Sequence, residues 1–388
     1  MDFAPESGQP LDPFPHYERM RESAPVFHDE ESGSWHVFRY DDVQRVLSEH
    51  ASFSSRMGGD DAAGTGQLFA SSLITTDPPR HRQLRSLVTQ AFTPKAVDAL
   101  APRISELTGE LLERTVPLGT ADLVQALAYP LPVIVISELL GVPAADRGRF
   151  KLWSDVIVSQ TRAGAATEEH RDTNQEMTEY FLALIDQRRS RPGDDLISSL
   201  LSAEIDGQKL SVSELLGFCS LLLVAGNETT TNLIGNAVLS FTEEPGTLDR
   251  LVQEPSLLPQ AIEEVLRFRS PVQSMYRVTV AETTVGGVRI PAGAPLVAWI
   301  GAANRDGRQF RDPARFDIGR SQNRHLAFGH GIHFCLGAPL ARLEARIALE
   351  AVLTRLPGLA LTPGAQLERM DSTIVYGLKS LPVRWDVS

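Results

Sequence analysis

The stretch Phe328-Gly-His-Gly-Ile-His-Phe-Cys335-Leu-Gly337 decides how this 388-residue chain is interpreted. It presents one of only two cysteines from a glycine-rich loop, and an apolar helical run follows it. Glycine serves where a backbone turns sharply or comes close to a ligand. Backbone N–H groups and a helix N-terminus favour a thiolate, so we expect the pKa of the Cys335 thiol to be lowered. Such a thiolate is a nucleophile or an axial metal ligand, and a small buried side chain is the simplest alternative.

The composition excludes several classes of protein. The 37 basic and 49 acidic residues give a net charge of −12, which argues against a nucleic-acid partner. Two cysteines cannot form a disulfide framework and suit a reducing compartment, so we expect a cytoplasmic protein. The first residues carry no signal-peptide pattern. The longest apolar run, residues 127–142, is interrupted by Pro130, Pro132 and Glu138, so we expect no membrane span.

Helical periodicity dominates the middle of the chain, and short β-rich runs with glycine and proline turns flank it. The segments expected to be rich in helix are residues 80–270 and 335–356. The segments expected to form small sheets lie near residues 25–40, 275–300 and 359–387. No linker separates these parts, so we predict one mainly α domain, residues 1–388, with small β-sheets. Residues 59–66 have the composition of a mobile loop, and long loops of this kind often act as lids.

One long helix is predicted to cross the protein. Ser211-Val-Ser-Glu214 is a capping box, and apolar periodicity then continues to about Phe241, a length of about 45 Å. The string Ala225-Gly-Asn-Glu-Thr-Thr230 lies at its middle, where a glycine costs about 1 kcal/mol. Its glutamate and threonine need partners inside an apolar helix. The alternative is a packing glycine, with threonines that hydrogen-bond the helix backbone.

Several charged residues have spacings that place them on common helix faces. Glu264 and Arg267 are i,i+3 neighbours, a spacing equally typical of a surface ion pair. His81 and Arg85 are i,i+4 neighbours. Each cation taken alone fits the solvated surface, and the histidine spacings do not form a compact zinc site.

The whole set resembles the cytochromes P-450 of the soluble, bacterial type. The family's loop pattern is Phe-Gly-x-Gly-x-His/Arg-x-Cys-x-Gly, and the positions that fill it are Phe328, Gly329, Gly331, His333, Cys335 and Gly337. Four separate motifs follow the family order from His81 to Gly337. The resemblance implies the family's helical fold, with haem b (heme b, iron protoporphyrin IX) between the long central helix and the Cys335 loop. Cys335 would be the axial ligand to the iron.

The resemblance also implies roles for the other motifs. Ala225 and Gly226 would leave room for dioxygen, while Glu228 and Thr229 would bring protons to it. The groups that would meet the haem propionates are His81, Arg85, Arg277 and His333. The groups that would form a structural ion network are Glu264, Arg267 and Arg315, the last within Pro313-Ala-Arg315-Phe316.

The implied reaction is monooxygenation, the insertion of one oxygen atom of O₂ into a lipophilic small molecule by hydroxylation or epoxidation. Electrons would come from a separate ferredoxin or flavodoxin, and we expect a monomer. The side chains that would line the substrate pocket are Leu68, Phe69, Leu73, Ile74, Leu222, Val272, Met275, Ile374 and Val375. The alternatives are an H₂O₂-driven peroxygenase, which commonly lacks the acid–alcohol pair, and a non-catalytic haem sensor.

A local basic cluster surrounds the Cys335 loop in the sequence of this acidic protein. Its members are Arg320, Arg324, His325, Arg342 and Arg346. They form either ordinary solvated charge or a docking surface for an acidic electron donor, which charge would steer toward the protein.

Overall fold

The structure is a computed structural model. It describes residues 12–56, 72–89, 92–150, 152–153, 156, 167–204, 207–370 and 372–387. The predicted lid segment 59–66 and the predicted pocket residues Leu68 and Phe69 lie outside the described residues.

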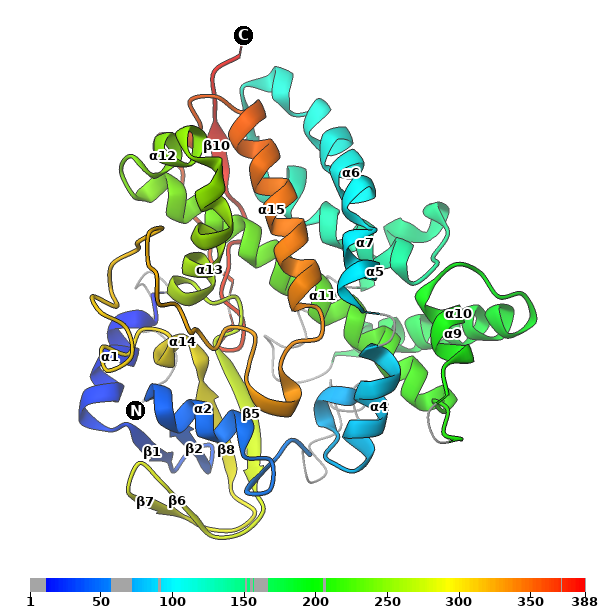
Figure 1. Cartoon of the computed structure of the whole chain (residues 1–388), viewed down its shortest axis with the longest axis vertical. Coiled ribbons are helices and arrows are strands. Elements are labelled where there is room, and N and C mark those ends of the chain that lie inside the picture. Colours follow the sequence, from blue (N-terminus) through cyan, green and yellow to red (C-terminus); the bar gives the residue numbers. More distant parts are fainter. Residues whose placement is uncertain are drawn as a thin grey trace.

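The long central helix is α11, Val212–Glu243, and it begins at the predicted capping box. The Ser211 hydroxyl accepts the N–H of Glu214 at 3.2 Å, and the Glu214 carboxylate accepts the N–H of Ser211 at 2.9 Å. The helix stays regular through the glycine at its middle. It crosses the molecule between α7, Pro130–Leu139, and α15, Ala338–Arg355 (Figure 1).

The other α-helices whose bounds the described residues define are shorter. Their bounds are α1 Phe14–Ser23, α2 Tyr40–Ser48, α4 Arg80–Thr89, α5 Pro94–Asp98, α6 Ala101–Glu113, α9 Glu168–Ser190, α10 Leu196–Ser202, α12 Thr247–Gln253, α13 Leu258–Phe268 and α14 Ile300–Ala303. A π-helical turn at Val124–Ala128 precedes α7. Single 3₁₀ turns lie at residues 73–75, 116–118, 144–146, 255–257 and 331–333.

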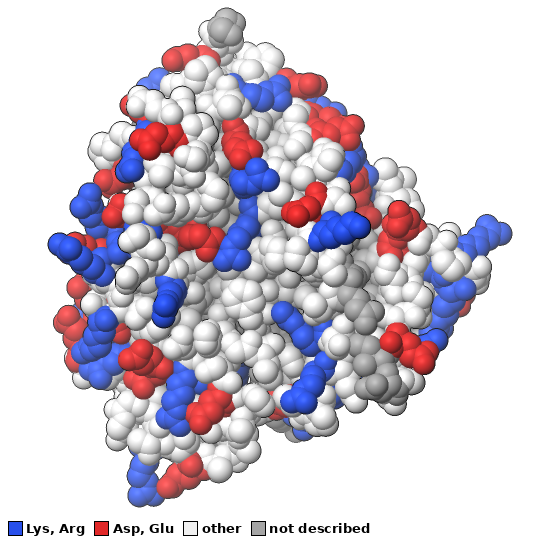
Figure 2. All heavy atoms as spheres, viewed as in Figure 1, with Lys and Arg blue, Asp and Glu red and all other residues white. Residues whose placement is uncertain are grey.

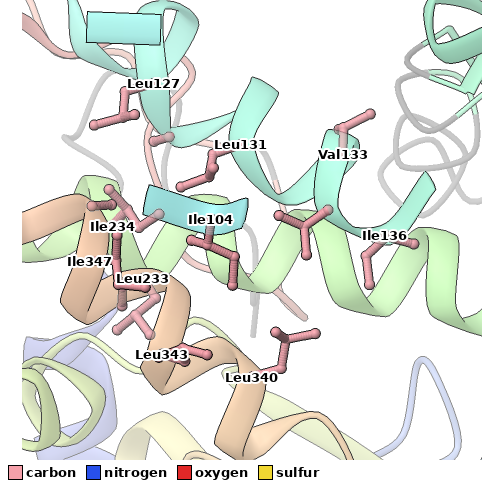
Figure 3. Close-up of a cluster of buried hydrophobic side chains, with 14 of the residues drawn as sticks. Ile104, Leu127, Leu131, Val133, Ile136, Leu233, Ile234, Leu340, Leu343 and Ile347 are labelled. Atoms are coloured by element: carbon pink, nitrogen blue, oxygen red, sulfur yellow. The ribbon is translucent and has the colours of Figure 1, made fainter. Parts of the chain in front are cut away.

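The largest hydrophobic core forms where four helices meet. Figure 3 shows Ile104 of α6, Leu131 of α7, Leu233 of α11 and Leu343 of α15 grouped together. All four side chains are buried, and burial of each contributes about 1.5–3 kcal/mol. This core fixes α15, and with it the cysteine loop that precedes α15, against the central helix.

A five-stranded sheet lies beside the helices, with strand order β1-β2-β8-β5-β3. Its strands are β1 Val26–Asp29, β2 Ser34–Val37, β3 Phe53–Ser54, β5 Ser274–Thr279 and β8 Pro295–Trp299. Only the β2–β8 pair is parallel, and β5 pairs antiparallel with β8 so that Arg277 lies opposite Leu296. Because side chains alternate along a strand, Met275 and Arg277 share one face of β5 and border the same cavity.

Two smaller sheets complete the β structure. Their strands are β4 Thr120–Asp122, β9 Ala360–Leu361 and β10 Pro382–Arg384 in one sheet, and β6 Thr283–Val285 and β7 Val288–Ile290 in the other. The predicted fold class, mainly α with small β-sheets, is therefore confirmed. Among the residues that the structure describes, no helix is both long enough and apolar enough to cross a membrane.

Candidate active site

The Cys335 loop is built around a sharp backbone turn. Gly329 and Gly331 both have positive φ angles, +73° and +70°, which residues other than glycine rarely adopt. A Cβ at position 331 would also lie 2.7 Å from the Cα of Ser48 in α2. The N–H of Cys335 donates to the carbonyl of Phe328 at 2.8 Å, which closes the loop immediately before α15.

The sulfur of Cys335 faces a cavity and receives backbone hydrogen bonds. The side chain is open to that cavity, although it lies deep in the protein. The prediction of a lowered pKa is wrong for the free thiol. Burial raises the pKa of Cys335, and the N–H groups of Gly337 and Ala338 together with Arg85 offset only part of that effect. A bound cation would favour the thiolate form of this sulfur.

The middle of α11 borders the same cavity. Ala225, Gly226 and Thr229 all line it, as predicted, and so does Thr230, which the sequence did not single out. The Thr229 hydroxyl donates to the carbonyl of Ala225 at 2.7 Å. This is the backbone bond expected of a helical threonine, and it leaves the lone pairs of the hydroxyl oxygen facing the cavity.

Glu228 lies apart from the cavity. It is buried, does not border the cavity, and its Oε1 accepts a hydrogen bond from Asn232 at 3.3 Å. Gly226 also has a packing role, because a Cβ there would lie 2.9 Å from Cδ1 of Ile136 on α7. The space beside Gly226 is thus filled by Ile136, and a larger side chain at position 226 would require that isoleucine to move.

Cationic and imidazole groups gather at one edge of the cavity. Arg85, Arg277 and His333 line it, and the His81 ring lies 4.3 Å from the His333 ring. Neither Arg85 nor Arg277 forms an ion pair with any described residue. Nε2 of His81 is buried with no hydrogen-bond partner among the described residues, whereas Nε2 of His333 meets the Ser55 hydroxyl at 2.9 Å.

Burial is the main cause that lowers the pKa values of these groups, and the charge of Asp77 offsets only part of it. Burial, followed by the charge of Arg85, lowers the pKa of His81 to about 4. Burial, followed by Arg277 and His81, lowers the pKa of His333 to about 3. Burial likewise lowers the pKa of Arg277 to about 10. A ligand with carboxylates at this edge would supply the missing counter-charge.

These residues fit an iron porphyrin. The orphaned Nε2 of His81 and the two unpaired arginines suit propionates, and the Cys335 sulfur suits an axial position on the iron. Among the described residues, no three His, Cys, Asp or Glu side chains gather as a metal site. The donor set therefore suits a prosthetic group that is held by one sulfur and, at its anionic edge, by cationic side chains of the protein.

The ion network on α13 differs from the prediction in one residue. Glu264 and Arg267 are fully buried and form a bidentate pair, with N···O distances of 2.7 and 2.8 Å. The second guanidinium on Glu264 belongs to Arg320, at 3.0 and 3.1 Å, and not to Arg315. The Arg315 side chain is exposed, and only its backbone carbonyl takes part, accepting from Arg267 at 3.0 Å and Arg320 at 3.2 Å.

The remaining pocket predictions divide into two groups. The predicted residues that line the cavity are Leu73, Ile74, Leu222, Val272 and Met275. Ile374 and Val375 do not line it. Val375 instead forms a β-bridge with Val272, and the Ile374 carbonyl accepts from Gln273, so this segment supports the wall from behind.

Sequence reasoning missed one charged residue of the wall, Glu344. It lies on α15 between buried leucine and isoleucine positions, and it borders the cavity. Its Oε2 has no hydrogen-bond partner among the described residues, and burial raises its pKa to about 8. A lone acid on the apolar face of a helix, four residues after Leu340, was the available signal.

A second hollow lies between α6, α7 and α10, away from the cysteine loop. Of the charged side chains that line it, Arg103 pairs with Glu138, and Asp195 pairs with the neighbouring Arg188. It borders no cysteine or histidine, so the cavity beside Cys335 is the candidate active site.

The fold and the site together define a helical, cofactor-dependent enzyme with a cysteine sulfur at a buried apolar cavity. A family model described as Cytochrome P450 matches residues 26–385. The putative cytochrome P450 YjiB of Bacillus subtilis (strain 168) is 47% identical over 381 residues, 96% of this chain and 93% of that protein. The erythromycin C-12 hydroxylase of Saccharopolyspora erythraea is 42% identical over 374 residues, 94% and 92% of the two chains.

Solved structures agree with these relatives. The crystal structure of CYP109E1 from Bacillus megaterium in complex with testosterone matches with a TM-score of 0.89 and 46% identity. The match covers 97% of this chain and 100% of that one. The chain belongs to the cytochrome P450 family, and it is a haem-dependent monooxygenase.

Proposed function

We propose that this chain uses O₂ to hydroxylate or epoxidise a lipophilic small molecule, with Cys335 as the axial ligand of haem b. The observation that carries the proposal is an apolar cavity bordered by the Cys335 sulfur, by Thr229 of α11 and by Arg85 and Arg277, which form no ion pair within the described part of the chain. When bound, the haem supplies the activation of dioxygen. The chain's own residues hold that group, shape the space for substrate and deliver protons.

The proposed cofactor contacts follow from the donors at each side of the cavity. The N–H groups of Gly337 and Ala338 stabilise negative charge on the Cys335 sulfur. Arg85 and Arg277, which lack ion-pair partners among the described residues, would bind the propionates together with the two histidines of the same edge.

The proposed proton delivery assigns different roles to Thr229 and Glu228. The Thr229 hydroxyl borders the cavity, and rotation about χ1 would release its proton from the Ala225 carbonyl and turn it toward the cavity. Glu228 is buried behind the wall beside Asn232, so it reaches the cavity only after its side chain moves. We therefore propose Thr229 as the group that positions the proton and Glu228 as a proton source.

The proposed substrate is a lipophilic molecule such as a terpenoid or steroid, a polyketide or a fatty acid. The side chains at the substrate end of the cavity are apolar, among them Leu73, Leu222, Val272 and Met275. Of the relatives, one is a C-12 hydroxylase of erythromycin and another is seen in complex with testosterone. A ligand library screened by the haem spin-state shift would identify the class, and shifts with polar ligands alone would contradict this proposal.

We also propose that the chain works as a monomeric single domain and receives electrons from a separate ferredoxin or flavodoxin. The support is the family match itself, which occupies residues 26–385. Turnover with a surrogate ferredoxin, its reductase and NAD(P)H tests the partner. Equal or faster turnover with H₂O₂ alone would favour the peroxygenase, and no turnover of any bound compound would favour a sensor.

Cys335→Ser is the direct test of the site. We expect the variant to lose the absorption band that a reduced carbon monoxide complex shows when the axial ligand is a thiolate, because a serine oxygen donates far less charge to iron. The wild-type protein measured in parallel is the control. An unchanged band in Cys335→Ser would overturn the assignment of the ligand.

A further inference from the structure

Two adjacent carboxylates of α13 hold different parts of the molecule. Glu264 points into the buried network with Arg267 and Arg320. Its neighbour Glu263 binds Arg342 of α15 through two parallel hydrogen bonds, 2.7 Å from Nε to Oε1 and 2.8 Å from Nη2 to Oε2. Glu263 therefore ties α13 to the helix that begins directly after the cysteine loop.

The same carboxylate also holds the segment that enters the loop. Nε2 of His325 lies 3.1 Å from Oε2 of Glu263, and the His325 side chain is buried. Nδ1 of His325 accepts the N–H of Ala327 at 3.2 Å, immediately before Phe328. Glu263 thus fixes both the entrance of the cysteine loop and the helix at its exit.

Arg342 links this pair to the sulfur itself. Its guanidinium lies over the Phe328 ring, 4.5 Å from the centroid, in a cation–π contact. Phe328 is the residue whose carbonyl accepts the N–H of Cys335 at 2.8 Å. The cation–π contact also places the positive charge of Arg342 beside the cysteine loop.

We propose that Glu263 and Arg342 form a second positioning network for Cys335, separate from the Glu264 network. The bidentate pair fixes the Phe328 ring and keeps one positive charge beside the loop, which stabilises the sulfur as a thiolate ligand. This inference rests on the proposed role of Cys335 as the axial ligand.

The geometry sets this pair apart from an ordinary surface ion pair. Exposed pairs contribute about 0–1 kcal/mol because water screens them and two flexible side chains must be ordered. Here the carboxylate is 30% exposed and the guanidinium 37%, and the contact is a bidentate fork backed by a buried histidine. Burial raises the pKa of Glu263, but hydrogen bonds from Arg342 and His325 outweigh it and lower the pKa to about 2.

The test compares four holoprotein variants with the wild type: Glu263→Gln, Arg342→Gln, the double variant, and Arg346→Gln. Arg346→Gln is a matched control, because Arg346 lies one turn later on α15 and pairs with Glu350 at a similar exposure. Each protein is reduced chemically and bound to carbon monoxide. Each complex is then titrated with guanidinium chloride. The thiolate absorption band and the helical circular dichroism signal are recorded in parallel during the titration.

We expect both single variants to lose the thiolate band at a lower denaturant concentration than the wild type, while the helical signal keeps its midpoint. The double variant should lose the band no earlier than the weaker single variant, because the two residues act as one unit. The reduction potential of Arg342→Gln should also be lower, since a positive charge near the iron is gone. The control should match the wild type in both measurements.

Three outcomes would overturn the inference: a thiolate band that is lost together with the helices, additive single effects, or an equal effect of Arg346→Gln. If Arg342→Gln fails to bind haem, Arg342→Lys replaces it. That variant keeps the charge but loses the fork and the flat stacking surface, so an intermediate loss of the band is expected and wild-type behaviour would count against the inference. A wild-type protein without the band would instead contradict the proposed function.

Discussion

At the scale of single residues, the role proposed for Thr229 predicts a specific defect. Thr229→Ala should keep the thiolate absorption band but form less product per NAD(P)H consumed. Only the hydroxyl that positions the proton is removed, a loss that typically costs 10²–10⁴-fold in the assisted step. Product and NAD(P)H are both measured with a surrogate electron donor.

Thr231→Ala is the matched control for Thr229→Ala. Thr231 is a buried threonine of the same helix, it bonds Asn227 at 3.3 Å, and it does not border the cavity. We expect its coupling of NAD(P)H to product to equal that of the wild type. Equal coupling in both variants would remove Thr229 from the proposed proton path.

Glu344 predicts an unusual dependence of stability on pH. Burial raises its pKa from 4.5 to about 8, so the unfolded chain releases this proton at a lower pH than the folded protein does. The folded state is therefore not penalised below pH 4.5 and is increasingly penalised as pH rises toward 8. The penalty reaches on the order of 5 kcal/mol, at 1.36 kcal/mol for each pKa unit.

Glu344→Gln removes that penalty. Denaturant titrations should give it about the wild-type stability at pH 5 and a clearly higher stability at pH 8, with a difference that grows between these values. A constant difference across the range would show that Glu344 carries the same charge in both states. That result would contradict the buried, protonated state assigned to it.

At the same scale, sequence reasoning succeeded where a motif fixes a residue and failed where burial decides. Cys335, Arg85, Arg277 and Thr229, which the motifs singled out, all border one cavity. The prediction of a lowered pKa for Cys335 was wrong because its loop lies deep in the protein, where the effect of burial on the pKa outweighs that of the helix N-terminus. No motif marks Glu344, whose state depends on the side chains packed around it.

At the scale of elements, the network on α13 gives a paired prediction. Arg320→Ala should destabilise the protein by about 3–5 kcal/mol, because Glu264 loses a guanidinium while fully buried. Arg315→Ala should change stability by at most about 0.5 kcal/mol, because its side chain is exposed and its backbone carbonyl remains. Denaturant unfolding of both variants measures the contrast, and the reverse ranking would restore Arg315 as the network arginine.

Helical elements were easier to predict than irregular ones. The capping box of α11 placed its start correctly, because the reciprocal bonds of Ser211 and Glu214 depend only on local sequence. Arg320 was missed because residues 304–327 carry almost no regular structure, so no periodicity indicates which arginine turns inward. Which arginine of that segment turns inward is set by contacts with α13, a helix that is distant from it in the sequence.

At the scale of the whole molecule, composition predicted the class of protein, but the sequence overstated the positive charge of one surface. The basic cluster near the Cys335 loop is largely neutralised. Arg320 is buried on Glu264, Arg342 and His325 share Glu263, and Arg346 pairs with Glu350. Figure 2 shows positive and negative side chains interspersed over this face of the molecule. Sequence proximity could not reveal these pairings, because the glutamates that bind Arg320, Arg342 and His325 come from α13.

Arg324 is the exception within that cluster, and it makes the docking of an electron donor testable. It is exposed and forms no ion pair with any residue that the structure describes. Two unit charges about 4 Å apart in water interact by about 1 kcal/mol, and reversing one doubles the change. We therefore expect Arg324→Glu to slow reduction by an acidic ferredoxin about thirtyfold at low salt, the factor that corresponds to about 2 kcal/mol. The measurement is the second-order rate constant in stopped flow.

Arg289→Glu is the control for this charge reversal. Arg289 is 77% exposed on the β6–β7 hairpin, which lies apart from the Cys335 loop (Figure 1). Its rate constant should match that of the wild type. The defect of Arg324→Glu should also disappear at high salt, because the screening length shrinks to about 3 Å at 1 M. A defect that persists there, or equal slowing by both variants, would show that Arg324 does not steer the donor to this face.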